Sequence, residues 1–486
     1  MAIYSFSPFG YDGSIVSVEV DLRHGIPATD IVGLADSSVK ETRERVQSAI
    51  RNSGLEYPNE RVLIALSPAD LKKEGAGFDL PIALGVVQKN FKEDVLILGE
   101  LELSGRIRPV SGVYAACTAA LANGIQYAIV PTENLNEALE TSIRAFGCDT
   151  LYDVYKLSDA LSTRQIATVD SYDNTISFRE PDEKLSIKMT EKEMLSLVVG
   201  ASGGFNMMFF GSPGSGKTTL MQYMQYLTPS LTEEQAQSVK RIYSLAGYGS
   251  KDENKIYPPF RTPHQTATIE GICGGGSNCR PGEISLAHNG VLFLDEAAEF
   301  RTSVLQMLRV PLENKCITLS RAGRTTVYPA NFQLLLALSP CPCGNYGSSQ
   351  KICLCSANAV EVYWKKLSGP LLDRVPIRLH IDQSEERKEY NIEELQAYVK
   401  RATEESRRIG TSFRDLTVEQ IYALIPANVF DILTMVAEKK EMSERRRYDL
   451  CKIWLTIVSA FGDSEERYFE DIDKAVELMG PFKFPN

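Results

Sequence analysis

The sequence has few histidines, no long apolar run and no excess of positive charge. Its four histidines are scattered and indicate neither a metal site nor a catalytic dyad. No apolar run approaches the roughly 18 residues that a transmembrane helix needs. The first basic residue is Arg23, so the charged start of a signal peptide is missing. We therefore expect a soluble, cytoplasmic protein without a membrane partner.

The balance of charge and the cysteine content narrow the class further. The net charge of −11 argues against a broadly basic surface for nucleic acid, although it leaves room for a local basic stripe. The ten cysteines, in a chain without an export signal, are expected to be thiols or metal ligands rather than a disulfide framework. At 486 residues the chain is long enough for about two to four domains.

Strand and helix patterns divide the chain into four segments. Residues 1–165 alternate the two patterns and predict an α/β domain, and residues 166–190 are polar and predict a linker with one edge strand. Residues 191–384 carry a second α/β pattern, and residues 385–486 are charged and helical. In the first segment the expected strands are Ser14–Asp21, Arg61–Leu66, Val95–Leu98 and Tyr127–Val130, and the expected helices are Ser37–Ser53, Asp79–Lys89 and Ser111–Asn123.

A phosphate-binding loop is the strongest motif in the chain. The apolar strand 205–210 is followed by G-x-x-x-x-G-K-T and a helical stretch, Thr219–Leu227, which is the order that a P-loop requires. Lys217 is expected to reach the β- and γ-phosphates, and Thr218 to ligate Mg²⁺. A chance glycine turn is the alternative, and the flanking strand and helix disfavour it. The expected ATP-binding residues are Gly211, Ser212, Pro213, Gly214, Ser215, Gly216, Lys217, Thr218 and Thr219.

A second apolar strand, 290–294, ends in two carboxylates. A strand buried on both faces of a parallel sheet is continuously apolar, and its C-terminal end faces the nucleotide crevice. Asp295 is expected to hold Mg²⁺, and Glu296 to orient or deprotonate the attacking water. Such a pair also occurs as a solvated strand end, but together with the P-loop it predicts ATP hydrolysis.

Four cysteines form two C-x-C pairs that are nine residues apart: Cys341, Cys343, Cys353 and Cys355. Four thiolates on a short glycine-bearing loop can surround one tetrahedral ion, as structural Zn²⁺ prefers. The spacing is tighter than the usual C-x₂-C, so buried free thiols and a stress disulfide remain alternatives. Cys273 and Cys279 have no second pair beside them and are expected to be ordinary thiols.

Several stretches together resemble one family. Arg280–His288, Cys341–Gly344 and Ser368–Arg374 are similar to the ComM/YifB-type, magnesium-chelatase-like AAA+ ATPases, and Pro68–Pro81 resembles that family's Lon-protease-like first domain. The resemblance implies this α/β domain, a P-loop AAA+ core of parallel sheet and helices with a zinc-binding cysteine insertion, and a helical C-terminal lid. It also implies a ring, expected to be a hexamer, that acts as a helicase on branched DNA during uptake and recombination.

The resemblance assigns three further roles. Arg374 matches an arginine finger, which stabilises charge on the γ-phosphate bound by the neighbouring subunit. Arg445 matches the second sensor, although Arg446 and Arg447 stand beside it and a structural ion pair is the alternative. Ser339 takes the place of the family's first-sensor Asn. A hydroxyl has one donor where an amide has two, so we expect slower intrinsic hydrolysis than in a relative with Asn.

The first domain lacks the chemistry of a Lon-type peptidase. Gly77 occupies the position of the serine nucleophile, and nucleophilic catalysis needs a side-chain atom there. The domain is expected to bind DNA or protein, or to cap the ring. A phosphate-contacting face and a solvated mixed surface are both compatible with its basic residues, Arg43, Arg45, Arg51, Arg61, Lys72 and Lys73.

A hairpin in the core carries two arginines. Residues 315–328 predict two strands around an Ala-Gly turn, with Arg321 and Arg324 beside the turn. Repeated by ring symmetry, such a hairpin can follow a phosphate backbone; a hairpin at a subunit interface is the alternative. The resemblance implies a DNA motor as the leading function, because the cysteine cluster and the Lon-like first domain are features of the ComM/YifB type. A chelatase-like subunit that remodels a protein partner is the second candidate, and a nucleotide-binding scaffold with little turnover is the third.

Overall fold

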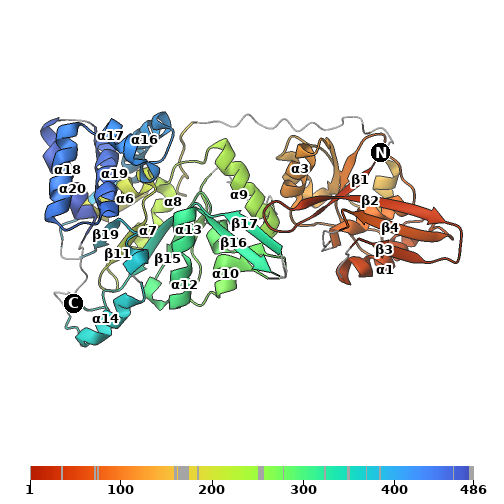
Figure 1. Cartoon of the computed structure of the whole chain (residues 1–486), viewed down its shortest axis with the longest axis horizontal. Helices are drawn as coiled ribbons and strands as arrows, with labels where there is room; N and C mark the ends of the chain where they lie inside the picture. Colours follow the sequence, from red (N-terminus) through yellow and green to blue (C-terminus); the bar gives the residue numbers. More distant parts are fainter. Residues whose placement is uncertain are drawn as a thin grey trace.

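The chain folds into two lobes along its long axis (Figure 1). The computed structural model describes residues 2–33, 37–69, 73, 76–157, 161, 175–182, 185–249, 257–276, 278–321, 324–346, 351–367, 369–382, 385–462 and 465–480. Among the helices of these residues, none has the length and apolar character needed to cross a bilayer. Mixed α/β architecture is found in both lobes, as the sequence predicts.

The N-terminal lobe is built on one seven-stranded sheet with the order β3-β4-β2-β1-β5-β8-β9. Strand β2 runs antiparallel to β1 and β4, whereas β1, β5, β8 and β9 are mutually parallel. The strands are β1 (Ile3–Ser7), β2 (Ser14–Arg23), β3 (Thr29–Val32), β4 (Arg61–Ser67), β5 (Val95–Ile97), β8 (Tyr127–Pro131) and β9 (Arg144–Cys148), with a small β6–β7 hairpin (Glu100–Leu101, Ile107–Arg108). The helices are α1 (Ser37–Asn52), α2 (Asp79–Val86), α3 (Val113–Ala122), α4 (Leu135–Leu139) and α5 (Leu151–Lys156).

Helix α1 shows why the sequence pattern predicts this lobe well. Val46, Ala49 and Ile50 lie on one helical face and are buried against the sheet, and Gly54 ends the segment with a φ of +72°. The four expected strands are confirmed. Helix α2 is shorter than expected, because the chain turns out of the helix after Val86 and Gln88 adopts a φ of +52°.

The second lobe contains a five-stranded parallel sheet with the order β12-β15-β18-β11-β19. Its strands are β12 (Phe260–Arg261), β15 (Val291–Leu294), β18 (Gln333–Leu338), β11 (Met207–Phe210) and β19 (Ile377–His380). Every residue of β11, β15 and β18 is buried, which explains their continuously apolar sequences. Helices around this sheet include α6 (Glu191–Gly203), α7 (Lys217–Gln222), α8 (Met224–Leu227), α9 (Glu233–Ala246), α12 (Thr302–Met307), α13 (Arg309–Asn314) and α14 (Ala357–Lys365).

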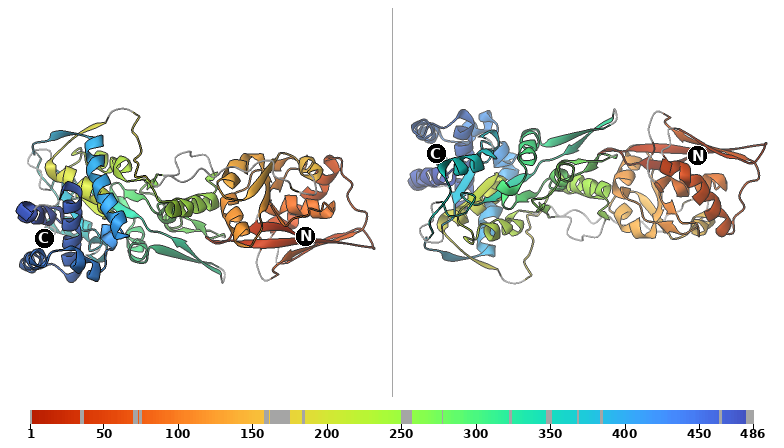
Figure 2. Two further views of the ribbon diagram at one scale, coloured as in Figure 1. Left: turned by 90° about the horizontal axis from the view of Figure 1, so that it is seen from above. Right: turned by 90° about the horizontal axis from the view of Figure 1, so that it is seen from below.

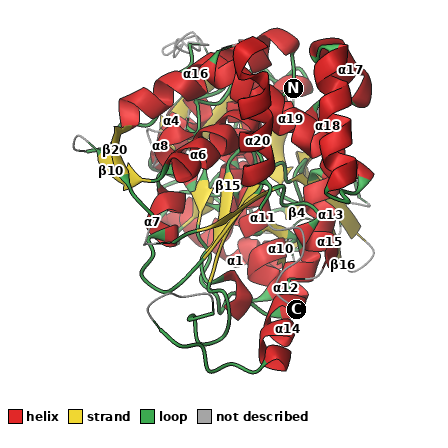
Figure 3. Cartoon of the chain, turned by 90° about the vertical axis from the view of Figure 1, so that its left-hand side faces the viewer, coloured by secondary structure: helices red, strands yellow, loops and turns green. Residues whose placement is uncertain are grey.

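The C-terminal part of the chain is helical, as predicted, and packs on the core sheet. Figure 3 shows these helices gathered in the upper part of the view, with α12 and α14 below. They share one hydrophobic cluster with α6 and with residues of β11 and β19. The expected edge strand is β10 (Ser186–Met189), which pairs with β20 (Lys388–Asn391); most of the predicted linker lies outside the described residues. The helices are α16 (Ile392–Ile409), α17 (Val418–Leu424), α18 (Ala427–Lys439), α19 (Glu444–Phe461) and α20 (Tyr468–Leu478).

The turn between β1 and β2 joins the two lobes. Helix α9 and the hairpin β16 (Cys316–Arg321)–β17 (Arg324–Pro329) lie between the lobes in both views of Figure 2. The backbone N–H of Tyr11 donates to Thr326 Oγ1 at 3.1 Å, and Arg241 Nε donates to the carbonyl of Tyr11 at 2.9 Å. A Cβ on Gly10 would lie 2.0 Å from Thr326 Oγ1, so this close approach requires glycine.

Candidate nucleotide site

The glycine-rich loop has the conformation that only glycine adopts easily. It leaves β11 at Phe210 and enters α7 at Lys217. Gly214 and Gly216 have φ values of +82° and +92°. A Cβ on Gly211 would lie 2.3 Å from the carbonyl oxygen of Ile381. The motif therefore meets the requirement that defines a P-loop, which is a tight backbone turn at a helix N-terminus.

Lys217 is buried at the centre of this loop. Its ammonium donates to the carbonyls of Gly211 and Ser212, both at 2.8 Å, and to Ser215 Oγ at 3.2 Å. Burial lowers the pKa of Lys217, and the nearby carboxylates of Asp295 and Glu296 oppose that effect. A phosphate oxygen offers a stronger, charge-assisted acceptor than these neutral groups. The ammonium of Lys217 is thus held at a position where phosphate oxygens can replace its present acceptors.

The two expected magnesium ligands contact each other. Thr218 Oγ1 lies 3.1 Å from Asp295 Oδ1, so a hydroxyl and a carboxylate meet at the end of β15. Oxygen ligands of this kind suit Mg²⁺. Glu296 is exposed beside them with a φ of +49°, a left-handed conformation that is costly for a residue with a side chain. The tertiary fold therefore brings the P-loop and the paired acids together, as the sequence predicts.

The turn Cys341–Gly344 lies against the P-loop. Ser339 directly follows β18, next to the Cys341–Gly344 turn. Gly344 has a φ of +77°, and a Cβ there would lie 2.6 Å from Pro213 Cγ and 3.8 Å from Ser339 Oγ. A side chain at position 344 would therefore displace Pro213 of the P-loop and contact Ser339, the expected first sensor.

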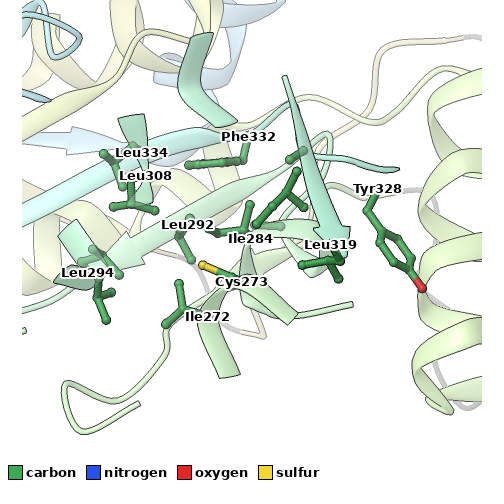
Figure 4. Packing of buried hydrophobic residues seen from close by; sticks show 14 of the residues in the cluster. Ile272, Cys273, Ile284, Leu292, Leu294, Leu308, Leu319, Tyr328, Phe332 and Leu334 are labelled. Carbon is green, nitrogen blue, oxygen red and sulfur yellow. The ribbon is translucent and has the colours of Figure 1, made fainter. Parts of the chain in front are cut away.

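The four cysteines of the C-x-C pairs form one cluster. Their sulfur atoms all lie within 4.8 Å of one another, and those of Cys341, Cys343 and Cys353 are 3.4 to 3.7 Å apart. Four thiolates at 2.3 Å from a tetrahedral Zn²⁺ stand about 3.8 Å apart, so the donor set fits this ion. A backbone hydrogen bond from Asn345 lowers the pKa of Cys343 to about 6, which favours the thiolate. Cys273, by contrast, is buried among apolar side chains (Figure 4).

One arginine at the P-loop was not predicted from the sequence. Arg387 Nη2 donates to Glu193 Oε1 at 2.9 Å and to the carbonyl of Ser215 at 3.3 Å, and Gly216 is its neighbour. Burial raises the pKa of Glu193, so this carboxylate depends on its partner. Arg387 stands in a charged run with no motif around it, and only the pairing of β10 with β20 brings it to the loop.

The two arginines of the family resemblance lie elsewhere. Arg374 and Arg445 line a cavity of about 250 Å³ together with Asn206, which precedes β11. The P-loop follows the other end of β11, and this four-residue strand separates the two edges by about 13 Å. Arg374 forms an ion pair with Glu313 and donates to the carbonyl of Pro370. Both arginines therefore lie toward the edge of the sheet that is opposite to the P-loop of the same chain.

The neighbours of Arg445 have different surroundings. Arg446 is buried and donates to the carbonyl of Met479 at 3.1 Å, and burial lowers its pKa. Arg447 lies over the ring of Tyr448 at 5.0 Å and 3.7 Å from Glu444. Of these three arginines, Arg445 is the one that lines the cavity beside Arg374. The geometry thus favours Arg445 over its neighbours for a role at that edge.

The predicted hairpin is present, and its two arginines have partners in the same chain. The guanidinium of Arg324 stands 3.4 Å from the ring centroid of Phe9, in the N-terminal lobe. Arg321 lies 3.7 Å from Glu270 in an exposed pair. Tyr328, at the end of the buried cluster in Figure 4, packs edge-on against Tyr11 with ring centroids 6.0 Å apart. Arg324 thus belongs to the junction of the lobes, which leaves Arg321 nearer to solvent.

The basic residues of the first lobe are largely paired with acids. Arg45 Nε donates to the buried Asp79 at 2.9 Å, Arg61 pairs with Asp30 at 2.7 Å, and Arg43 pairs with Glu44 at 2.9 Å. Lys73 is buried and donates to the carbonyl of Pro68, whereas Lys72 lies outside the described residues. These contacts favour the mixed surface over a phosphate-contacting face.

Comparison with known proteins gives extended matches. The family described as magnesium chelatase, subunit ChlI, matches residues 185–389, and a second description, subunit ChlI of Mg-chelatase, matches residues 18–134. An uncharacterized protein of Mycobacterium tuberculosis is 40% identical over 390 residues, covering 78% of this chain and 76% of that protein. Competence protein ComM of Haemophilus influenzae is 36% identical over 78% of this chain and 76% of its own length. YifB of Escherichia coli, itself uncharacterized, is 36% identical over 78% and 75%.

Proposed function

The chain belongs to the ComM/YifB-type family of magnesium-chelatase-like AAA+ ATPases, and from this premise we propose that it is a ring-forming DNA motor. In this proposal, residues 1–165 form a Lon-like domain without peptidase activity. Residues 191–384 form the ATPase core, which the linker 166–190 precedes, and residues 385–486 act as its helical lid. The motor drives branch migration in DNA uptake or recombination.

The observation that carries the proposal is the division of the catalytic groups between two edges of one sheet. Lys217, Asp295 and Glu296 lie at the carboxyl ends of the strands, and Arg374 and Arg445 lie beyond the amino ends. A head-to-tail ring brings the second edge of one subunit to the first edge of the next. We expect six subunits, each site being completed by its neighbour.

The chemistry at such an interface follows from the side chains. Lys217 holds the β- and γ-phosphates, and Thr218 and Asp295 hold Mg²⁺, which neutralises phosphate charge when it is bound. Glu296 orients the attacking water, and Ser339 donates one hydrogen bond to it. Arg374 of the neighbouring subunit stabilises the charge that develops on the transferred phosphoryl group, after release from Glu313. The four cysteines hold Zn²⁺ as a structural ion.

ATPase rates with and without DNA test the proposal. We expect single-stranded, duplex or four-way-junction DNA to stimulate hydrolysis at a stated salt concentration, because phosphate contacts weaken as salt rises. Light scattering with a non-hydrolysable ATP analogue should report a ring. A chain that stays monomeric with nucleotide and with every DNA ligand contradicts the proposal. Stimulation by a protein partner, with no response to DNA, supports the chelatase-like alternative instead.

Arg321 offers a sharper test of the DNA path. Because Arg321 is exposed at the hairpin and Arg324 is held by Phe9, Arg321→Ala should remove most of the DNA-stimulated rate and spare the basal rate. The comparison variant is Arg408→Ala, which removes an exposed arginine of α16 whose ion pair, among the described residues, is with Glu405 of the same helix. Loss of the basal rate together with the stimulated rate would favour an interface role for the hairpin.

A further inference from the structure

A cavity of about 460 Å³ lies beside α9, away from the P-loop. It borders Phe260 at the start of β12, at the amino ends of the strands, whereas the P-loop lies at their carboxyl ends. This volume falls within the roughly 300–1,000 Å³ of small-molecule sites. Its wall combines aromatic rings with cations: Tyr226, Tyr243, Tyr248, Tyr257 and Phe260 with Arg179, Lys240 and Arg261.

The rings at this cavity are partly open to a ligand. Tyr248 is 51% exposed, and its ring centroid lies 5.9 Å from that of Tyr243 with the planes tilted by 50°. The guanidinium of Arg261 stands 5.9 Å from the centroid of Tyr248. An exposed ring with a cation beside it is the arrangement on which planar bases stack in single-strand-binding proteins.

The cations differ in how far they are already satisfied. Arg261 makes two hydrogen bonds to Glu283, each of 2.8 Å, and Lys240 pairs with Glu140 at 3.2 Å. Arg179 has no ion pair within the described part of the chain, and its guanidinium stands 5.9 Å from the ring centroid of Tyr257. Its buried Nε has no hydrogen-bond acceptor there either. Arg179 is therefore the cation of this cavity whose charge no described carboxylate already neutralises.

Two acids also line the cavity and limit what it can hold. Glu180 and Asp182 are both exposed at its rim. Of the three cations, Arg261 and Lys240 are already paired with acids. The charges at this cavity therefore disfavour a polyanion with many phosphates, and they are compatible with one phosphate beside a ring. The ligand that fits is a single base with its phosphate.

We propose that this cavity binds one nucleotide unit, with the base against Tyr248 and the phosphate at Arg179. The unit comes either from a single-stranded nucleic acid or from a free nucleotide. The single-strand source rests on the proposed DNA motor, and it gives the motor a contact outside the hairpin. The site itself rests on the rings and on Arg179 alone.

The test uses the full chain without added nucleotide, and a parallel set of the same variants carries Lys217→Ala, which removes phosphate binding at the P-loop without adding a competitor for the cavity. The probes are a short oligo(dT) that carries one 2-aminopurine and, separately, 2-aminopurine riboside monophosphate, because stacking quenches the fluorescence of this base. We expect quenching in the wild-type chain. Tyr248→Ala should weaken binding about 5- to 150-fold, the range of one base–aromatic stack, and Tyr248→Phe should restore it. Arg179→Gln should weaken binding and reduce its salt dependence.

The control is Tyr422→Ala, which removes an equally exposed tyrosine from α17, and the basal ATPase rate checks that each variant folds. Oligonucleotide binding that is lost in Tyr248→Ala supports the single-strand source. If only the monophosphate binds, and Tyr248→Ala abolishes that binding, the free-nucleotide source is supported. The proposed DNA motor is tested independently, by whether DNA stimulates hydrolysis. Wild-type affinity in Tyr248→Ala for both probes, or no quenching at all, overturns the site and leaves the motor standing.

Discussion

The two edges of the core sheet differ in how complete they are. At the carboxyl edge, Lys217 donates to the carbonyl of Gly211, and Thr218 contacts Asp295. At the amino edge, Arg374 is paired with Glu313 beside a cavity that contains no phosphate-binding loop. The residues of the expected nucleotide site thus contact one another at the first edge, whereas Arg374 and Arg445 line a separate cavity at the second.

In the proposed ring, this difference means that each chain supplies half of two nucleotide sites. The core sheet then separates Arg374 from the P-loop of its own chain. Glu313 pairs with Arg374 from an exposed position, so a phosphate can replace it as the partner of the guanidinium in the proposed ring. In that ring, hydrolysis requires assembly.

Mixing two inactive variants is the strongest way to break the comparison. Lys217→Ala and Arg374→Ala should each lower the ATPase rate by about 10³-fold or more. In mixed rings about a quarter of the interfaces combine an intact P-loop with an intact arginine, so activity should return on co-expression. The steady-state ATPase rate measures it. A mixture no more active than its components would place both groups in one subunit's site.

A substitution of Arg387 tests whether this arginine is a second cation, besides Lys217, that binds phosphate at the carboxyl edge. Arg387→Gln removes the charge beside Ser215 and Gly216, so we expect ATP to bind about tenfold more weakly, in line with the loss of one charge-assisted contact. Titration calorimetry with a non-hydrolysable analogue measures the Kd. Lys388→Gln, at the exposed next position, should leave it unchanged. Equal affinity in both variants would reduce Arg387 to a partner of Glu193.

Gly344 tests the contact between the cysteine loop and the P-loop. Gly344→Ala forces a Cβ toward Pro213 at a φ of +77°, so we expect the KM for ATP to rise several-fold. The cysteines are untouched, and the metal content should stay at that of the wild-type chain. Gly54→Ala, at a φ of +72° where a Cβ meets no atom within 4 Å among the described residues, is the matched control. An unchanged KM would show that the loop yields without affecting the nucleotide.

Asp449 gives the smallest expected effect, on stability at the amino edge. Burial raises its pKa to about 6 from 3.8, against the opposing charges of Lys452, Arg445 and Arg446, while Asp373 adds to the rise. The folded chain then holds a proton that the unfolded chain releases, so stability falls as pH rises from about 4 to about 6. The full shift corresponds to about 3 kcal/mol at most.

Chemical denaturation at pH 4.5 and pH 7 measures this effect. Asp449→Asn should lose less stability between the two pH values than the wild-type chain does, because the amide does not titrate. Asp431→Asn, which replaces another acid of the C-terminal helices, serves as the control because the side chain of Asp431 is exposed. An equal fall in Asp449→Asn and in the wild-type chain would assign the pH dependence to other groups.

The carboxyl edge was largely predictable from the sequence, and the amino edge was not. The P-loop is contiguous, and the acids of β15 follow an apolar strand, so local pattern and the rule for parallel sheets place them together. Arg387 carries no pattern because its position depends on a strand pair between residues about 200 apart in sequence. The resemblance pointed to Arg374 and Arg445, but not to the cavity that they share with Asn206.

Motifs that act over a few residues were therefore determined by the sequence alone: the glycine-rich loop, the paired acids, the spacing of the four cysteines and the helical C-terminal segment. Local backbone geometry and hydrophobic periodicity need no distant partner. Only the tertiary structure decided which end of the sheet each arginine occupies, that Arg324 rests on Phe9, and that tyrosines from α8, α9 and the approach to β12 meet around one cavity. These arrangements depend on long-range packing, in which each contact forms only after many others have brought its two sides together.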